Sequence, residues 1–250
     1  MSEFADAFAF IFDGSNWSGS DGLLRQLGEQ LLLTGASMLI VMVLGLPLAL
    51  WLGHIGKGGT FAINLSNIGR AVPVFAVLGL LSVGFVGSAD FGPFGRAGLA
   101  TLVSLVLFAF PPIITNTYVG MREIDRDIIE AARGMGMSEW RIFSKVEMPL
   151  VFPLVLTGIR LAVVQVWATA TIAALVAGPG LGNTITYGYT NGQFQYVLGG
   201  AIVVAAIALV LEGLVVLAER AADPMLRAQR RSRAAIAQNE LPLDKESALS

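Results

Sequence analysis

The stretch 161–211, LAVVQVWATATIAALVAGPGLGNTITYGYTNGQFQYVLGGAIVVAAIALVL, contains no Asp, Glu, Lys or Arg. A bilayer-spanning helix needs about 20 residues, so this uncharged stretch is long enough for more than one crossing. Of the 250 residues in the chain, 55% are hydrophobic and 14% are charged, whereas soluble domains carry about 25% charged residues. Too little charge is present to cover a water-facing surface. The sequence therefore predicts an all-α protein that crosses a membrane several times.

Five apolar segments are long enough to cross about 30 Å of hydrocarbon at about 1.5 Å per residue. They are Leu31–Leu52, Ala71–Ser88, Ala97–Gly120, Pro149–Ala177 and Tyr196–Ala218. We therefore predict a polytopic fold of about five transmembrane helices, in which residues 29–218 form the membrane domain.

The basic residues are distributed unequally between the two sides of this arrangement. Twelve Lys or Arg fall on the side made of residues 53–59, 120–148 and 219–250. Two fall on the side made of residues 1–28, 87–96 and 178–195. Because Lys and Arg favour the cytoplasmic side, the N-terminus is expected outside, and the C-terminus and the 120–148 loop inside.

The two ends of the chain are expected to differ from the spans. Residues 1–28 place phenylalanines between acidic residues, a pattern typical of a segment lying at a membrane interface. We expect an extracytoplasmic interfacial segment here, with a short helix packed on the bundle as the alternative. Residues 219–250 are polar and lose hydrophobic periodicity, so we expect a disordered cytoplasmic tail whose first arginines lie at lipid phosphates.

The longest cytoplasmic loop contains signals for two short helices. Asp125 is a good N-cap for the first helix, and Gly134 and Gly136 end it, because glycine adopts helix-ending conformations at little cost. Ser138 is placed to cap the second helix. Pro149 then begins the next span, where its missing N–H costs nothing. A loop bound only for solvent would not need this much order.

A fixed spacing of residues is the most informative feature of this loop. The spaced residues are Glu130-Ala131-Ala132, Gly136, Val146, Met148 and Pro149. They resemble the EAA loop of ABC importer permeases, the membrane subunits of binding-protein-dependent transport with a MetI-like fold. Val146 and Met148 stand where that pattern has Ile and Leu. The stretches KVEMPLVFPLVLTGIRLA and ALVAGPGLGNTI are further similar to permeases of osmoprotectant importers, and this similarity runs from about residue 63 to residue 191.

The resemblance implies a membrane subunit that catalyses nothing itself and holds no cofactor. Its expected partners are cytoplasmic ABC ATPase subunits, an extracytoplasmic substrate-binding protein, and a second copy of the chain or a related permease. The expected place is the bacterial plasma membrane, and the expected cargo is a compatible solute such as glycine betaine or choline. Import of another small solute, such as an amino acid, is the alternative.

The resemblance also implies which residues couple the chain to its ATPase. They are Glu130, Ala131, Ala132, Gly136, Met137, Trp140 and Pro149. Small residues allow close packing in such a loop, whereas Met137 and Trp140 are large apolar side chains of the kind found at interface centres. For Trp140, anchoring of the loop to the inner membrane surface is the alternative.

Polar residues in the fourth predicted span are candidates for the translocation path. They are Gln165, Trp167, Thr169 and Thr171. Polar side chains in a span face other helices or a water-filled path, so helix packing is the alternative. The glycine-rich residues 178–183 lack the Lys-Ser/Thr ending of a phosphate loop. They are expected to form a turn before a short re-entrant or interfacial segment.

Other function classes fit the sequence less well. There is no cysteine, and the one histidine, His54, is expected at the surface of a short inner loop. An intramembrane hydrolase needs a nucleophile with a base, or paired metal ligands, and no pair of acids lies within the spans. Glu212 is expected to reach the interface or to meet Arg160 or Arg220. A secondary transporter usually has internal repeats, which are not found here, and nothing suggests a nucleic-acid partner.

Overall fold

The computed structural model describes residues 2–88, 92–95 and 97–222. Within these ranges the secondary structure is entirely helical. Four helices are long and apolar enough to cross a membrane, and the number is five if one bent helix pair counts as a single span. The predicted all-α polytopic fold is confirmed. The expected disordered tail falls, from residue 223 onward, outside the described residues.

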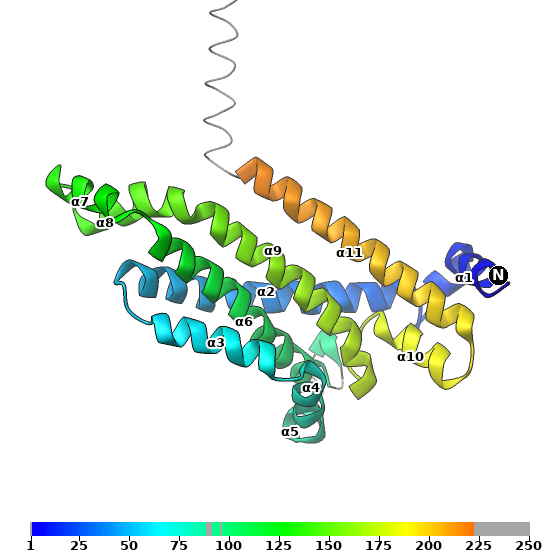
Figure 1. The fold of residues 1–250 in the computed structure, drawn as a ribbon. Helices are drawn as coiled ribbons and strands as arrows, with labels where there is room; N and C mark the ends of the chain where they lie inside the picture. The colour runs from blue at the N-terminus through cyan, green and yellow to red at the C-terminus, as the bar shows by residue number, and fades with distance from the viewer. Residues whose placement is uncertain (1, 89–91, 96, 223–250) are drawn as a thin grey trace, which may run out of the picture.

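Figure 1 shows the order of the helices along the chain. The α-helices are α1 (Ser2–Phe12), α2 (Leu23–His54), α3 (Gly59–Ala71), α4 (Val74–Val83), α5 (Phe85–Ser88), α6 (Gly98–Glu123), α7 (Arg126–Gly134), α8 (Glu139–Ile142), α9 (Met148–Ile172), α10 (Gly182–Thr190) and α11 (Phe194–Ala222). Short 3₁₀ turns occupy Gly14–Trp17, Gly92–Phe94 and Ala173–Val176, and a π-helical segment occupies Phe143–Glu147.

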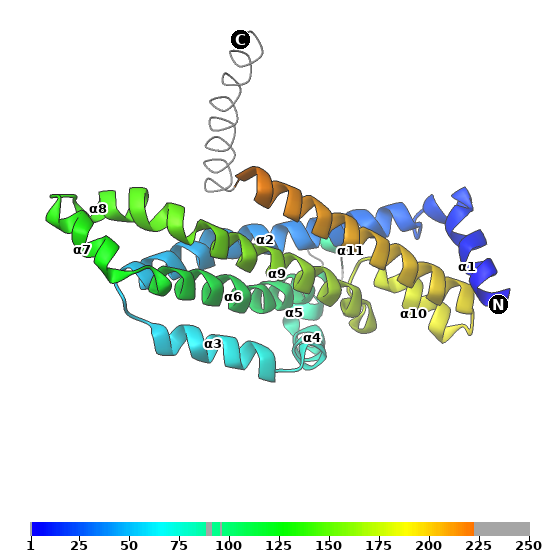
Figure 2. The same cartoon turned by 45° about the horizontal axis from the view of Figure 1, so that its top comes forward.

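Three long helices, α2, α6 and α9, pack together and form the centre of the bundle. Helix α3 lies along α6, while α1 and α10 lie along α11. Helices α7 and α8 project beyond one end of the bundle, and α1 lies at the opposite end (Figures 1 and 2). The first of these ends, formed by α7 and α8, is called the α7–α8 end.

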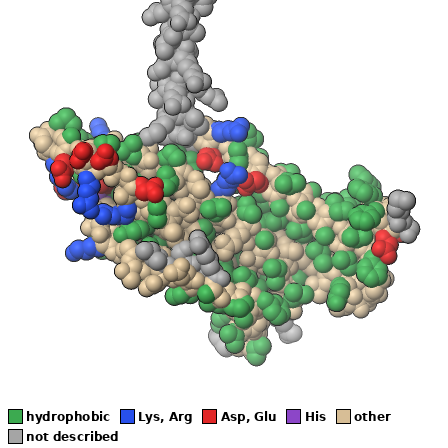
Figure 3. Space-filling model, viewed as in Figure 1, with side chains coloured by type: hydrophobic (Ala, Val, Ile, Leu, Met, Phe, Trp, Pro, Cys, Tyr) green, Lys and Arg blue, Asp and Glu red, His purple; other side chains and the backbone are tan. Residues whose placement is uncertain are grey.

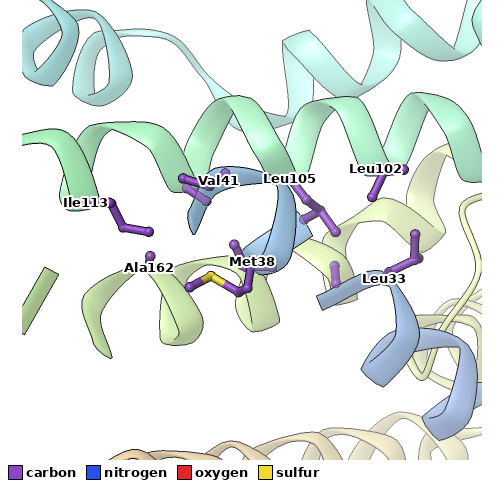
Figure 4. Packing of buried hydrophobic residues seen from close by; sticks show 10 residues of the cluster. Leu33, Met38, Val41, Leu102, Leu105, Ile113 and Ala162 are labelled. Carbon is purple, nitrogen blue, oxygen red and sulfur yellow. The ribbon is translucent and has the colours of Figure 1, made fainter. Parts of the chain in front are cut away.

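The core is a set of interlocking apolar side chains from the three central helices. Leu33, Met38 and Val41 of α2 lie in one cluster with side chains of α6 and α9, and Met38 lies beside Ala162 of α9 (Figure 4). The outer helix α11 instead exposes large apolar side chains such as those of residues 209, 214 and 217. An apolar face of this extent is incompatible with water and fits lipid or another membrane helix.

The predicted bounds of the second span, Ala71–Ser88, are wrong. A helix already begins at Gly59, and α3 and α4 then meet at an angle of 83°. Pro73 causes the break, because it lacks an amide N–H and disfavours helical geometry in the residue before it. Accordingly, Val72 is extended, with φ −81° and ψ 123°. Polar residues in α3, among them Asn64 and Asn67, lower its hydropathy, so the sequence analysis did not identify it as part of an apolar span.

The N-terminal helix packs on the bundle, which was the alternative expectation for residues 1–28. The Phe10 ring lies 4.6 Å from the Tyr196 ring of α11, and Gly199 gives it room. Phe4 and Phe12 remain exposed on α1. The interfacial placement of this helix therefore stays a prediction.

Helix α8 of the 120–148 loop continues directly into the following span. Glu139–Val176 is one helical run of 38 residues, with the π segment inside it. At this segment the Met148 N–H donates to the Phe143 carbonyl, five residues back. The wider turn accommodates Pro149, which has no N–H to offer the normal helical ladder. The expectation that Pro149 starts a separate span is therefore corrected: it lies within a continuous helix.

A buried polar contact ties this continuous helix to the end of α2. His54 Nδ1 lies 2.6 Å from Glu147 Oε2, and Glu147 is only 7% exposed. The His54 ring also contacts the Phe143 ring edge-on at 5.4 Å. The expectation of a surface histidine is wrong, because a partner 93 residues away in the sequence covers it.

We predict that Gly120 sets the close approach of α6 and α9. A Cβ atom there would lie 2.8 Å from Val151 Cγ2 and 2.9 Å from Leu154 Cβ. Gly120→Ala should lower the free energy of unfolding by about 1–3 kcal/mol, measured as a lower melting temperature in detergent. The matched control is Gly213→Ala on α11, where a Cβ meets nothing within 4 Å. Equal melting temperatures for the two variants would contradict this.

We predict that His54 and Glu147 are coupled in stability. His54→Ala leaves a buried carboxylate without its partner and should cost about 1–3 kcal/mol. Glu147→Leu in the same chain removes that carboxylate, so the double variant should recover part of the loss. Thermal unfolding of the three variants measures this. A double variant as unstable as the sum of the single ones would show that the contact contributes nothing.

Candidate functional site: an exposed loop and a groove between helices

The first short helix of the loop, α7, begins as the sequence predicts. Asp125 is its N-cap, and the Asp125 carboxylate accepts a hydrogen bond of 3.0 Å from the Asp127 N–H. This bond satisfies one of the free amides at the helix start. The cap therefore fixes where α7 leaves the end of α6.

The end of α7 is shaped by Gly136. This residue has φ +78°, a left-handed conformation that favours glycine. The Met137 N–H donates to the Ala132 carbonyl and the Gly136 N–H to the Arg133 carbonyl. Together these bonds form a Schellman cap, which ends a helix and turns the chain. The predicted helix-ending role of Gly136 is confirmed.

An exposed ion pair fixes α8 against α7. Arg133 donates two hydrogen bonds to Glu139, of 2.9 and 3.1 Å. These bonds hold the pKa of the Glu139 carboxyl below its ordinary value and raise the pKa of Arg133. Ser138 occupies the N-cap position of α8 as predicted, although its hydroxyl makes no capping bond.

The residues predicted to couple the chain to an ATPase lie together at the α7–α8 end, and most of them are exposed. Trp140 is 73% exposed, and its ring rests 5.6 Å from that of Phe143. Glu130, Ala131 and Gly136 are also exposed. Ala132 is buried, and Met137 and Pro149 are half-buried. Figure 3 shows acidic and basic side chains gathered at this same end of the molecule.

A groove of about 980 Å³ opens between α3, α6, α9 and α11. Its walls are mainly apolar, with a few polar groups. The polar side chains that line it are Thr115, Asn116, Thr157, Arg160, Gln165 and Glu212. A concave, mostly apolar surface with a few placed polar groups is typical of a small-molecule site.

Two charged residues meet in this groove. The Arg160 Nε of α9 donates to Glu212 Oε1 of α11. The prediction that Glu212 meets Arg160 is confirmed. Figure 3 shows a smaller group of charged side chains over the C-terminal half of α11, the helix that carries Glu212.

The four residues predicted for the path take up different positions. Gln165 lines the groove. Trp167 is 2% exposed, and its Nε1–H donates to the Val204 carbonyl of α11. Thr169 is buried, and the Thr171 hydroxyl accepts a hydrogen bond from Gln30 of α2. The last three therefore pack helices together in this chain, as the alternative expectation has it.

The sequence analysis missed a buried amide network at the end opposite the loop. The Gln30 carbonyl accepts a 2.9 Å bond from the Leu181 N–H in the glycine-rich turn. Gln26 accepts bonds from the backbone N–H and the hydroxyl of Thr184. Two glutamines four residues apart share one helix face, and this spacing was the available signal. The predicted first span began after them, at residue 31, whereas α2 begins at residue 23. The expected short segment after the turn is α10.

Known proteins resemble this chain over most of its length. A glycine betaine/carnitine/choline transport system permease protein, OpuCB, of Bacillus subtilis is 30% identical over 81% of this chain and 89% of its own. An osmoprotectant import permease protein of Salmonella typhimurium is 32% identical over 76% of this chain and 78% of its own. The inward-facing MetNI methionine ABC transporter matches with a TM-score of 0.62 at 24% identity, over 82% of this chain and 95% of that one.

The family comparison agrees with the fold. Residues 37–224 match the family described as the inner membrane component of binding-protein-dependent transport systems. This range includes the groove, the loop, the whole of α6, α9 and α11, and the part of α2 from residue 37 onward. The chain therefore belongs to the family of inner membrane components of binding-protein-dependent transport systems.

Proposed function

We propose that this chain is the membrane subunit of an ATP-driven importer for a small compatible solute such as glycine betaine or choline. One observation carries the proposal. The EAA-spaced loop is an ordered, exposed structure, and its helix α8 runs without a break into α9, which lines the groove. A displacement of the loop would therefore be transmitted to the groove through one continuous helix.

The loop has the properties expected of a rigid element that docks on a partner protein. Gly136 and the Arg133–Glu139 pair fix its shape before any partner binds. The exposed Trp140 supplies a large apolar side chain at its tip. A fixed shape with an aromatic anchor binds at low entropic cost. In this proposal a cytoplasmic ABC ATPase subunit receives the loop, so hydrolysis takes place on the partner.

The groove supplies one wall of a path rather than a closed channel. It is open along α3, α6, α9 and α11, so a second copy or a related permease would be needed to close it. An extracytoplasmic binding protein would deliver solute at the end that carries α1 and α10. This assignment places the N-terminus outside the bacterial plasma membrane and the loop and C-terminus in the cytoplasm, in line with the positions of Lys and Arg.

The proposed class of solute is inferred from the transport functions in the names of similar permeases. The similar permeases of Bacillus subtilis and Salmonella typhimurium carry the names of glycine betaine, carnitine, choline and osmoprotectant transport. The groove offers both charges and apolar walls, which suit small charged solutes with methyl groups. An amino acid or a related small solute is the alternative cargo.

The coupling role predicts that Trp140→Ala and Gly136→Asp uncouple the transporter. The first change removes the exposed anchor. The second replaces glycine at φ +78°, a backbone conformation that residues with a side chain rarely adopt. Reconstituted with its ATPase and binding protein, each variant should lose at least about tenfold in ATP-dependent glycine betaine uptake, since an interface anchor contributes 2 kcal/mol or more.

Trp51→Ala is the matched control, because Trp51 is 59% exposed on α2 but lies outside the loop. It should keep both uptake and co-purification of the ATPase. Wild-type uptake in the two loop variants would refute the coupling role. A complex that hydrolyses ATP but imports no betaine, choline or carnitine would instead refute the solute class.

A further inference from the structure

The Arg160–Glu212 pair joins the middle of α9 to the C-terminal half of α11, two helices that line the groove. Arg160 is the central residue of α9, and Glu212 lies in the C-terminal half of α11. Charged groups within a bilayer are costly and mark functional positions. Neither side chain is sealed off: 43% of the Arg160 side chain and 28% of the Glu212 side chain are exposed. The pair is therefore accessible from the groove.

The pair leaves hydrogen-bonding capacity unused. Arg160 donates its hydrogen bond to one carboxylate oxygen, Glu212 Oε1. The other oxygen, Oε2, is buried and has no hydrogen-bond partner among the described residues. An arginine that serves only as a clasp commonly engages both oxygens of its partner. The guanidinium N–H groups that remain are available to a third group, and the acceptor capacity of Oε2 is unmet by any described residue.

A second unpartnered polar atom belongs to a residue that lines the same groove from another helix. Thr115 of α6 lines the groove, and its buried Oγ1 lacks a hydrogen-bond partner among the described residues. Apolar side chains, including Leu161 and Val164, complete the wall nearby. Buried polar atoms without partners are rare, because each costs free energy. The walls of this groove therefore contain hydrogen-bonding capacity that the described residues leave unmet.

We propose that Arg160 and Glu212 form a transient site for a zwitterionic solute, which places its carboxylate on Arg160 and its ammonium on Glu212. The inference rests on the proposed function, in which the groove is the path. A zwitterion meets both charges with opposite ones, so the occupied site stays neutral. A cation alone would face Arg160, and an anion alone would face Glu212. Leu161 and Val164 suit the methyl groups of a quaternary ammonium.

The site therefore prefers glycine betaine to choline, and variants of the pair test this preference in the reconstituted transporter. In Arg160→Gln/Glu212→Gln, the apparent KM for glycine betaine should rise about tenfold or more, because contacts to charged groups are lost. The KM for choline should change less, and ATPase co-purification should persist. A KM for glycine betaine equal to that of wild type would show that the pair only joins the helices.

A binding measurement gives a readout that does not depend on transport. Because the chain has no cysteine, Leu161→Cys introduces a single thiol in the groove, and maleimide labels it in the assembled complex. Glycine betaine should slow this labelling more than choline does, and the effect should vanish when Arg160→Gln/Glu212→Gln is added. Tyr189→Cys, 78% exposed on α10, is the control that neither solute should protect.

The two measurements separate the possible failures. Protection by glycine betaine without uptake would leave the zwitterion site standing and refute the proposed importer. Uptake without protection, or equal protection by choline, would leave the importer standing and refute the site. If the double variant does not assemble, the comparison of glycine betaine with choline in Leu161→Cys alone decides the matter.

Discussion

The fold depends on one constraint, which is that backbone polar groups within a bilayer must find partners inside the protein. The glycine-rich turn between α9 and α10 is the place where this is hardest, because the helix ladder stops there. Gln30 solves the problem from α2. It is fully buried, accepts a bond from Leu181 N–H, and donates to the Trp167 carbonyl and the Thr171 hydroxyl. One side chain thus joins the first span, the fourth span and the turn that follows it.

At the opposite end of the molecule, capping bonds and polar contacts hold the exposed loop in a fixed position. Capping bonds and the Gly136 turn give the loop its local shape. His54 and Glu147 then join the end of α2 to the π segment below α8. Polar contacts at both ends therefore anchor α2 to the long helix that includes α9. Between these two ends the core is apolar, and the close packing of complementary side chains is enough to hold its helices together.

Local signals in the sequence predicted much of this structure, and long-range contacts account for the rest. Continuous apolar runs located four spans to within several residues, and the caps at Asp125 and Gly136 depend on neighbours only. The second span was misplaced because α3 carries polar residues and Pro73 bends the chain after it. The partners of His54 and Gln30 lie 93 and 151 residues away, and no local pattern specifies them. The Arg160–Glu212 pair was foreseen only as one of several options.

The unbroken helix from Glu139 to Val176 has a mechanical consequence. Its 38 residues make a rod of about 57 Å at about 1.5 Å per residue. A rod of this length that tilts by about 10° around its midpoint moves its two tips by about 5 Å in opposite directions. An inward displacement at the loop is then an outward displacement beside the glycine-rich turn. Arg160 lies close to the midpoint of this helix, so such a tilt would displace it little.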